Sequence, residues 1–344
     1  MTPVDAWIWP KQPTVTRHDV GLINQTYTVS SEGRVVGILQ RLNTDIFAPE
    51  VHEDIEAVTR ALAAQGLPTT SLLRTASGQL WHTTSDGSVW RALTPIGDRT
   101  IETLSRPEDA REAGALVGRF HSALRTFQWD FRSVRAGAHD THAHMDRLAR
   151  AVNDRRSHRL WWDTASLSET IGEGWRTLCT PSDLPRRIVH GDLKISNLRF
   201  TGDRATALID LDTLAWGTLD LELGDAMRSW CNTGSEDDAE AAFDLEIFRA
   251  AMSGYANGSR DNPPTEVEWA SVLPGLERIC WELASRFAWD ALSESYFGWD
   301  SSRYPAAGEH NLARARGQVQ LARSVRTQRE DASSALLQIR QAHR

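Results

Sequence analysis

The sequence predicts an α+β fold with two lobes: a small lobe of antiparallel strands with one helix, and a large, mainly helical lobe. Short apolar runs separated by turn residues occupy residues 14–42, which is typical of three antiparallel strands. From Pro107 onward, apolar residues recur at the spacing of a helix face. We therefore expect residues 1–97 to form an N-terminal lobe that ends in a hinge, and residues 98–344 to form a C-terminal helical lobe.

The composition is that of an ordinary soluble enzyme. The 344 residues are 40% hydrophobic and 24% charged, and the formal net charge of −8 argues against a nucleic-acid-binding surface. No apolar run is long enough to cross a membrane, and no secretory signal pattern follows Met1. The three scattered cysteines indicate neither a disulfide framework nor a zinc site. We expect a cytoplasmic protein whose partner is a small-molecule substrate, with no membrane or nucleic acid partner.

The most informative stretch runs from His190 to Asn197 and fits the pattern H-x-D-L-x-x-x-N, which is the catalytic-loop pattern of protein kinases. Phosphoryl transfer needs a carboxylate that orients the attacking hydroxyl and takes its proton, and an amide oxygen that holds magnesium. Asp192 suits the first role and Asn197 the second, while Lys194 would add positive charge near the migrating phosphoryl group. The alternative is a chance turn between two strands.

A second motif favours the kinase interpretation over coincidence. A strand at 198–200, a turn at 201–203 and a strand at 205–210 predict a hairpin that ends in Asp210, as kinases present their second magnesium ligand. The acid stands in the string Ile209-Asp210-Leu211-Asp212 rather than in D-F-G. This variant resembles the aminoglycoside phosphotransferase-like kinases, which are small-molecule kinases with a protein-kinase-like fold. The resemblance implies ATP and Mg²⁺ as cofactors.

The N-terminal strands would bind the nucleotide. In a kinase, the turn that contains Gly21 and Asn24 covers the phosphates, although this turn taken alone indicates only a hairpin. The strand that follows should carry a lysine for the ATP phosphates, and the expected position holds Gln40, with Arg41 beside it. Either Gln40 hydrogen-bonds to phosphate without supplying charge, or Arg41 supplies the charge.

The next predicted helix, from about residue 49 to 64, places Glu56 where kinases keep the glutamate partner of that lysine. With no lysine present, Glu56 either pairs with Arg41 or is solvated. The residues after this helix predict a second hairpin whose last strand is 89–93, followed by the hinge at 94–97.

Histidines and acids cluster at residues 139–146, which could indicate a metal site. Asp140 and Thr141 are also good N-terminal caps for a helix that continues through Leu148 and Val152. We favour the helix start over the metal site. Further along, the predicted helix 277–292 places Arg286 and Asp290 four residues apart as a charged pair.

Several strings look like those of the N-acetylhexosamine 1-kinases, from the first hairpin to the last helix. They are residues 21–27, 38–47 and 209–213, then Arg286-Phe287, Asp290, Tyr296-Phe297, Tyr304-Pro305 and 310–312. The resemblance is weak at 127–186. It implies that Asp192, Arg286, Asp290 and Tyr296 contact the sugar, and that the strand lysine is absent throughout that group. Two departures concern Gly191, which replaces an asparagine, and residues 298–302, which separate Tyr296 from Tyr304.

These observations predict an ATP- and Mg-dependent kinase that phosphorylates a sugar hydroxyl, namely the anomeric hydroxyl of an N-acetylhexosamine or related hexose. One alternative is an aminoglycoside-type or choline-type kinase of the same fold, which an acidic substrate cleft would favour. The other is a non-catalytic pseudokinase. The missing lysine suggests it, and the intact Asp192, Asn197 and Asp210 argue against it.

Overall fold

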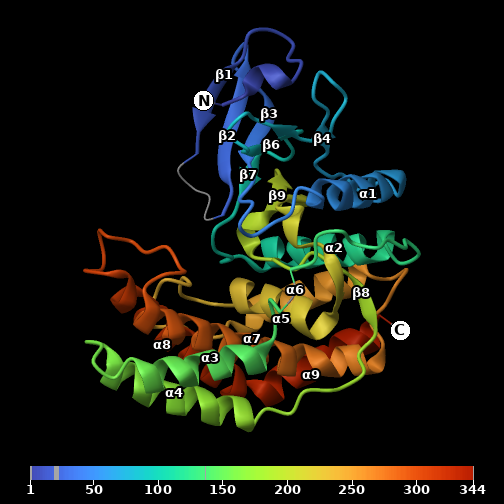
Figure 1. The fold of residues 1–344 in the computed structure, drawn as a ribbon. Coiled ribbons are helices and arrows are strands. Elements are labelled where there is room, and N and C mark those ends of the chain that lie inside the picture. Colours follow the sequence, from blue (N-terminus) through green and yellow to red (C-terminus); the bar gives the residue numbers. More distant parts are fainter. Residues whose placement is uncertain (1, 19–22, 136, 344) are drawn as a thin grey trace.

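The computed structural model describes residues 2–18, 23–135 and 137–343. Figure 1 shows a sheet-rich N-terminal lobe above a C-terminal part that is mostly helical. This confirms the predicted α+β architecture. In the described part of the chain, no helix is long and apolar enough to cross a membrane.

The sheet of the N-terminal lobe is antiparallel throughout, with the strand order β1-β2-β3-β6-β4 and β5 paired to β6. The strands are β1 (Thr14–Arg17), β2 (Gln25–Ser31), β3 (Arg34–Arg41), β4 (Leu72–Leu73), β5 (His82–Thr83) and β6 (Val89–Leu93). The three strands expected within 14–42 are therefore present. Helix α1 (Val51–Ala64) buries Ile55, Val58 and Leu62 because they recur on one helix face.

Two small sheets connect this lobe to the helices. The predicted hairpin forms as β9 (Leu198–Thr201) and β10 (Arg204–Leu208), and β7 (Arg99–Thr100) joins it at the edge of β9. A second pair joins β8 (Arg186–Val189) to β11 (Ala215–Thr218), a pairing that the sequence analysis did not anticipate. The loop 190–197 therefore leaves one sheet at β8 and enters the other at β9.

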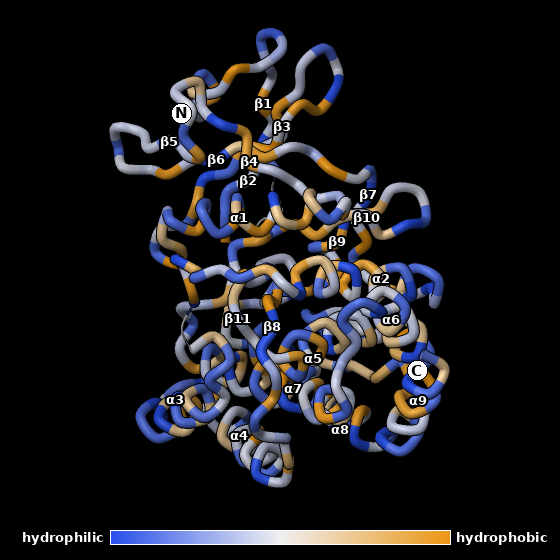
Figure 2. Tube along the Cα trace, turned by 90° about the vertical axis from the view of Figure 1, so that its right-hand side faces the viewer, coloured by the Kyte–Doolittle hydropathy of each residue, from blue (hydrophilic) through white to orange (hydrophobic). Residues whose placement is uncertain are grey.

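The rest of the C-terminal part is helical. The helices are α2 (Pro107–Ala123), α3 (Thr141–Asp154), α4 (Trp161–Arg176), α5 (Leu219–Trp230), α6 (Leu245–Gly258), α7 (Glu266–Ser293), α8 (Ala307–Thr327) and α9 (Arg329–Ala342). Helix α7 contacts α3, α4, α5 and α8, and is therefore the central helix of this part. Figure 2 shows hydrophilic residues on the outer turns of α3, which buries only Thr141, Leu148 and Ala151. Gln328 separates α8 from α9.

Helices α2 and α6 approach each other unusually closely because glycines face the partner backbone. A Cβ added to Gly114 would lie 1.9 Å from the carbonyl oxygen of Ala251, and one added to Gly254 would lie 1.9 Å from that of Arg111. Any side chain at these positions forces the helices apart. This contact matters for the site, since α2 also contacts β8, which precedes the catalytic loop, and β10, which pairs with the strand that follows it.

The close approach predicts that Gly254→Ala lowers the free energy of unfolding by about 1–3 kcal/mol, because the added methyl group overlaps the α2 backbone. Gly172→Ala is the matched control: Gly172 lies in α4 with no atom within 4 Å of an added Cβ, so alanine there should stabilise by about 0.5–1 kcal/mol. Urea unfolding followed by circular dichroism measures both. Equal effects of the two substitutions would contradict the packing argument.

Candidate active site

The loop that carries the predicted catalytic motif is held from below by Glu222 on α5. Its carboxylate accepts hydrogen bonds from the backbone N–H groups of His190 (2.8 Å) and Gly191 (3.0 Å). Burial alone would raise the pKa of Glu222, but the hydrogen bond and charge of His121 hold that pKa below its usual value. His121 in turn contacts the hydroxyl of Tyr255 at 3.0 Å, so this histidine is part of the support for the loop.

Gly191 occupies a position that only glycine fits. Its φ of 79° lies in the left-handed region, and a Cβ there would lie 2.6 Å from the carbonyl oxygen of Thr213. The hydroxyl of Thr213 also donates to the carbonyl of His190 (2.7 Å), which draws the two segments together. The glycine that departs from the N-acetylhexosamine 1-kinase pattern therefore has a local steric reason in this chain.

The structure brings together the two predicted catalytic residues of the loop, Asp192 and Lys194, and its predicted metal ligand, Asn197. The side-chain amide of Asn197 donates to Asp192 Oδ2 (3.0 Å) and to the Asp192 carbonyl (2.9 Å), and Lys194 Nζ lies 3.3 Å from Asp192 Oδ2. Burial lowers the pKa of Lys194, but the charges of Asp192 and then Asp210 raise it overall, so the ammonium form is stabilised. The side chain of Asp192 remains 32% exposed, which leaves it accessible to an acceptor.

Asp210 stands at the end of the hairpin in a left-handed conformation, with φ 62° and ψ 56°. Such strain at a non-glycine residue often marks a functional position. Burial, and then the negative charges of Asp212 and Asp192, raise the pKa of Asp210 to about 6. A divalent cation would relieve this concentration of negative charge. Magnesium sites commonly use one or two protein oxygen ligands together with substrate phosphates, so Asp210 and Asn197 fit a Mg²⁺ ion.

The N-terminal lobe reaches this site through Asp212, which the sequence analysis assigned no role. Arg91 on β6 makes a two-pronged ion pair with Asp212, and Arg91 Nε donates to Gln40 Oε1 (2.8 Å). Asn24 Nδ2 also donates to Asp212 Oδ2 (2.7 Å). Gln40 and Asn24, predicted to bind the cofactor, thus both lie beside this pair. Arg91 was missed, although a lone charge in the apolar strand 89–93 was a signal.

The other residues predicted to bind the cofactor are placed differently. Glu56 forms an ion pair with Arg74 at 2.8 Å and not with Arg41. The ion pair that kinases form between the strand lysine and a glutamate of this helix is therefore not formed by Glu56. Gly21 lies outside the described residues.

Apart from Asp192, the residues expected to contact the substrate lie near the C-terminal end of α7 and in the loop that follows it. Asp290 is fully buried, and its carboxylate accepts hydrogen bonds from the backbone of the loop that follows the helix and from Asn311. The expected pair with Arg286 does not form among the described residues, and Asp290 shapes the loop that presents Tyr296. The hydroxyl of Tyr296 accepts from Arg135 Nη2 (2.6 Å), and the guanidinium of Arg286 lies 5.6 Å from the centroid of the Phe297 ring.

The histidine-rich segment begins a helix, as we favoured. Asp140 caps α3 by accepting a hydrogen bond from the N–H of Ala143 (3.0 Å). His139 Nδ1 lies 3.0 Å from Glu282 Oε1, and Thr141 donates to the other oxygen of the same carboxylate (2.6 Å). Within the described ranges, no group of three or more His, Cys, Asp or Glu residues is arranged to hold a metal ion.

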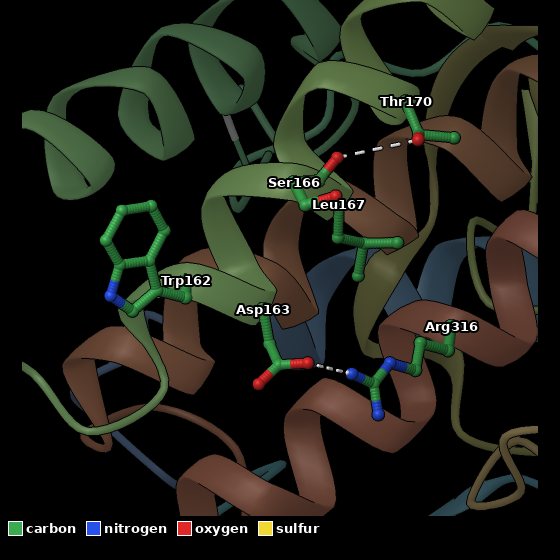
Figure 3. Close-up of a pocket in the computed structure, with 6 residues that line it drawn as sticks. All are labelled: Trp162, Asp163, Ser166, Leu167, Thr170 and Arg316. Atoms are coloured by element: carbon green, nitrogen blue, oxygen red, sulfur yellow. Dashed lines mark hydrogen bonds and ion pairs between the residues drawn. The ribbon is translucent and has the colours of Figure 1, made fainter.

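A surface hollow lies elsewhere, between α4 and α8 (Figure 3). It is lined by Trp162, Asp163, Ser166, Leu167, Thr170 and Arg316. An ion pair of 2.6 Å between Asp163 and Arg316 crosses it. None of the residues that carry the predicted chemistry lines this hollow.

Comparison with known families supports the assignment of the motifs. The profile of the phosphotransferase enzyme family, APH, matches residues 14–256, a range that holds the N-terminal hairpin, the catalytic loop and Asp210. The chain belongs to this family. Membership confirms the aminoglycoside phosphotransferase-like family predicted from the two motifs, while the N-acetylhexosamine 1-kinase branch stays a prediction.

The chain is distantly similar to homoserine kinases and to several solved kinase structures. A homoserine kinase of Methylorubrum populi is 29% identical over 175 residues, which are 50% of this chain and 50% of that protein, so the chain spans about half the length of this relative. The structure of amicoumacin kinase hAmiN with AMP-PNP, Ca²⁺ and Ami has a TM-score of 0.60 at 16% identity and covers 91% of this chain and 89% of that chain. A microcompartment-associated aminopropanol kinase has a TM-score of 0.61 at 13% identity and covers 97% of each chain. These likenesses confirm the kinase fold.

The assignment of metal ligands in this APH family member predicts that Asp210→Ala weakens Mg-ATP binding, because the remaining ligand is an uncharged amide. Calorimetric titration with Mg-ATP should show a loss of affinity that excess magnesium does not fully restore. Asp203→Ala is the matched control, since Asp203 lies in the turn of the same hairpin with its side chain 83% exposed. Equal affinity in Asp210→Ala and the parent, with activity intact, would contradict the assignment.

Proposed function

We propose that this protein is a kinase that uses Mg-ATP to phosphorylate a hydroxyl group of a neutral sugar, namely the anomeric hydroxyl of an N-acetylhexosamine or related hexose. The observation that carries the phosphotransfer proposal is the assembly of Asp192, Lys194, Asn197 and Asp210 in one site. The alternative of a non-catalytic pseudokinase has less support, since each of these four groups is present.

We assign each residue the role that its contacts support. Asp192 orients the acceptor hydroxyl and takes its proton, because its carboxylate is partly exposed and is held by Asn197 and Lys194. Lys194 places a positive charge beside the phosphoryl group that is transferred. Asn197 and Asp210 hold the magnesium ion, which when bound neutralises charge on the ATP phosphates.

The proposal of a neutral acceptor rests on charge pairing beyond Asp192. Asp225 contacts Arg228 at 3.0 Å, and Glu282 contacts His139 at 3.0 Å. Burial lowers the pKa of His139, but the hydrogen bond and charge of Glu282 raise it overall, which favours the charged form of the pair. An ammonium group of an acceptor would have to compete with Arg228 for Asp225 or with His139 for Glu282, because both acids already have basic partners.

Two residues near the end of α7 are suited to bind sugar hydroxyls or an acetamide. Arg286 forms no ion pair with any described residue, so its guanidinium donors are available, and its charge acts on His139. Tyr296 is 48% exposed, and its ring lies beside Trp289 and Phe297. Aromatic faces next to directed donors are a common way to bind a sugar ring.

An amino alcohol is the second candidate acceptor. It is favoured by the homoserine kinase relative and by the fold of the aminopropanol kinase. Asp225 is the group that would bind its ammonium. Burial, and in addition the charge of Asp192, raise the pKa of Asp225, so an added cation would stabilise its charged form.

For the base, Asp192→Asn should lower kcat by about a hundredfold or more while Mg-ATP still binds, because the amide keeps the shape of the side chain but accepts no proton. Coupled turnover assays give kcat, and calorimetry gives the nucleotide affinity. Asp203→Asn, on the exposed turn of the neighbouring hairpin, should behave as the parent. Unchanged turnover in Asp192→Asn would remove Asp192 from its role.

For the acceptor, the purified protein is incubated with Mg-ATP and each of a panel: N-acetylhexosamines, hexoses, glucosamine, homoserine, aminopropanol, choline and aminoglycosides. The phosphorus NMR spectrum of each product identifies the phosphorylated position. We expect an anomeric phosphate on an N-acetylhexosamine. Phosphorylation of an amine-bearing acceptor, with no sugar turned over, would overturn the sugar proposal and leave the kinase proposal standing.

A further inference from the structure

The β3 position that lacks the usual lysine has a basic neighbour on β6, as the strand register shows. In the antiparallel pair of β3 and β6, Gln40 stands directly opposite Arg91. Gln40 occupies the position where a kinase strand carries its lysine, and its amide oxygen accepts the Arg91 Nε–H at 2.8 Å. The positive charge that is absent at position 40 of β3 is therefore present on the neighbouring strand β6.

Glu56, at the position of the glutamate that usually pairs with this lysine, also has a different partner. Glu56 on α1 pairs with Arg74, whose side chain is 53% exposed, and so takes no part in the site. Arg91 pairs instead with Asp212, two residues beyond the predicted metal ligand Asp210, and both side chains of this pair are almost completely buried. The site therefore contains a buried cation and its acid partner, but they come from other elements than the strand lysine and helix glutamate of a kinase.

We propose that Arg91 binds the phosphates of the nucleotide in place of a β3 lysine, with Asp212 as its acid partner. This inference rests on the nucleotide site of the proposed function. A guanidinium has five N–H donors, and the three contacts to Gln40 and Asp212 leave two for phosphate oxygens. The permanent charge and fork-shaped donors of arginine suit phosphate binding.

Other basic residues nearby fit this role less well. On β2, β3 and β6, all of which are fully described, the basic residues are Arg34, Arg41 and Arg91, and only Arg91 is buried. Lys194 is committed to Asp192 on the acceptor side of the metal ligands. The charge of Asp210 also raises the pKa of Arg91, so the guanidinium lies within electrostatic range of this predicted metal ligand.

The test is the dependence of affinity on phosphate. Calorimetry on the full chain, without acceptor, measures the affinity for Mg-ATP, Mg-ADP and adenosine. In Arg91→Gln, we expect the affinities for ATP and ADP to fall by at least about tenfold and that for adenosine to change by less than about twofold. Arg74→Gln, which removes an arginine of the same lobe from the outer pair with Glu56, should leave all three affinities unchanged.

Moving the positive charge from position 91 to position 40 gives a second, independent test. In Gln40→Lys/Arg91→Gln, the cation stands on the opposite strand at the usual position, and ATP affinity should recover most of what Arg91→Gln loses. Gln40→Lys alone should not tighten ATP binding, because the new ammonium would lie against the Arg91 guanidinium. Failure of the double variant to recover any phosphate-dependent affinity, although it folds, would overturn the proposal.

Loss of one partner from a buried ion pair can prevent folding. Arg91→Gln/Asp212→Asn removes both charges together and replaces Arg91→Gln if that variant is unfolded by circular dichroism. An equal loss of adenosine and ATP affinity, or no loss of either, would mean that Arg91 is only a structural residue. In both cases the kinase proposal stands. A parent protein that binds no Mg-ATP and transfers no phosphate would instead refute the proposed function itself.

Discussion

The buried ion pair between Arg91 and Asp212 is the contact on which the geometry between the N-terminal lobe and the active site depends. Taking two charges out of water is costly, and the pair persists because further hydrogen bonds satisfy it. Gln40 accepts from Arg91, and Asn24 donates to Asp212. Burial would raise the pKa of Asp212, but the charge and hydrogen bonds of Arg91 hold it below its usual value. The pair therefore ties β3, β6 and the loop before β2 to the segment that follows Asp210.

A second buried acid, Glu222, holds the catalytic loop in place from its opposite side. Glu222 accepts two backbone hydrogen bonds from the loop, and Trp230, one helix end further on α5, donates to the carbonyl of Leu193 at 2.7 Å. The loop is therefore held by polar contacts to a helix rather than by its own short 3-10 turn. This explains how a segment with so little regular structure can keep Asp192 and Asn197 in one arrangement.

The fold and the catalytic loop could be predicted because both depend on local patterns. Strand alternation, helix caps such as Asp140, and the spacing of Asp192, Asn197 and Asp210 are visible within a few tens of residues. The acid partner and the cation were missed for a physical reason: Arg91 and Asp212 are 121 residues apart and meet only in the folded chain. The same holds for Gly191, whose need for glycine comes from the carbonyl of Thr213.

The expectation for Asp290 shows how helix spacing can mislead. The spacing of four residues between Arg286 and Asp290 suggested that they form an ion pair on one helix face. The helix ends at Ser293, so the backbone N–H groups of the loop that follows lie outside its hydrogen-bond pattern. Asp290 accepts hydrogen bonds from Ser295, Tyr296 and Phe297 at 2.8–3.0 Å, which satisfies these donors in the protein interior. Because Asp290 is used for the loop, Arg286 keeps its donors.

The two sides of Asp192 therefore differ in their charge, and this difference connects the structure to the proposed reaction. On the side of Asp210, neighbouring carboxylates raise the pKa of that residue to about 6, a sign of negative charge that a divalent cation would compensate. On the other side, Asp225 and Glu282 have basic partners at 3.0 Å. Under the proposed function, the metal compensates the negative charge near Asp210, whereas Asp225 and Glu282 on the acceptor side are already paired with Arg228 and His139. An acceptor in such a site is selected by directed hydrogen bonds, which discriminate strongly against molecules that lack the matching group.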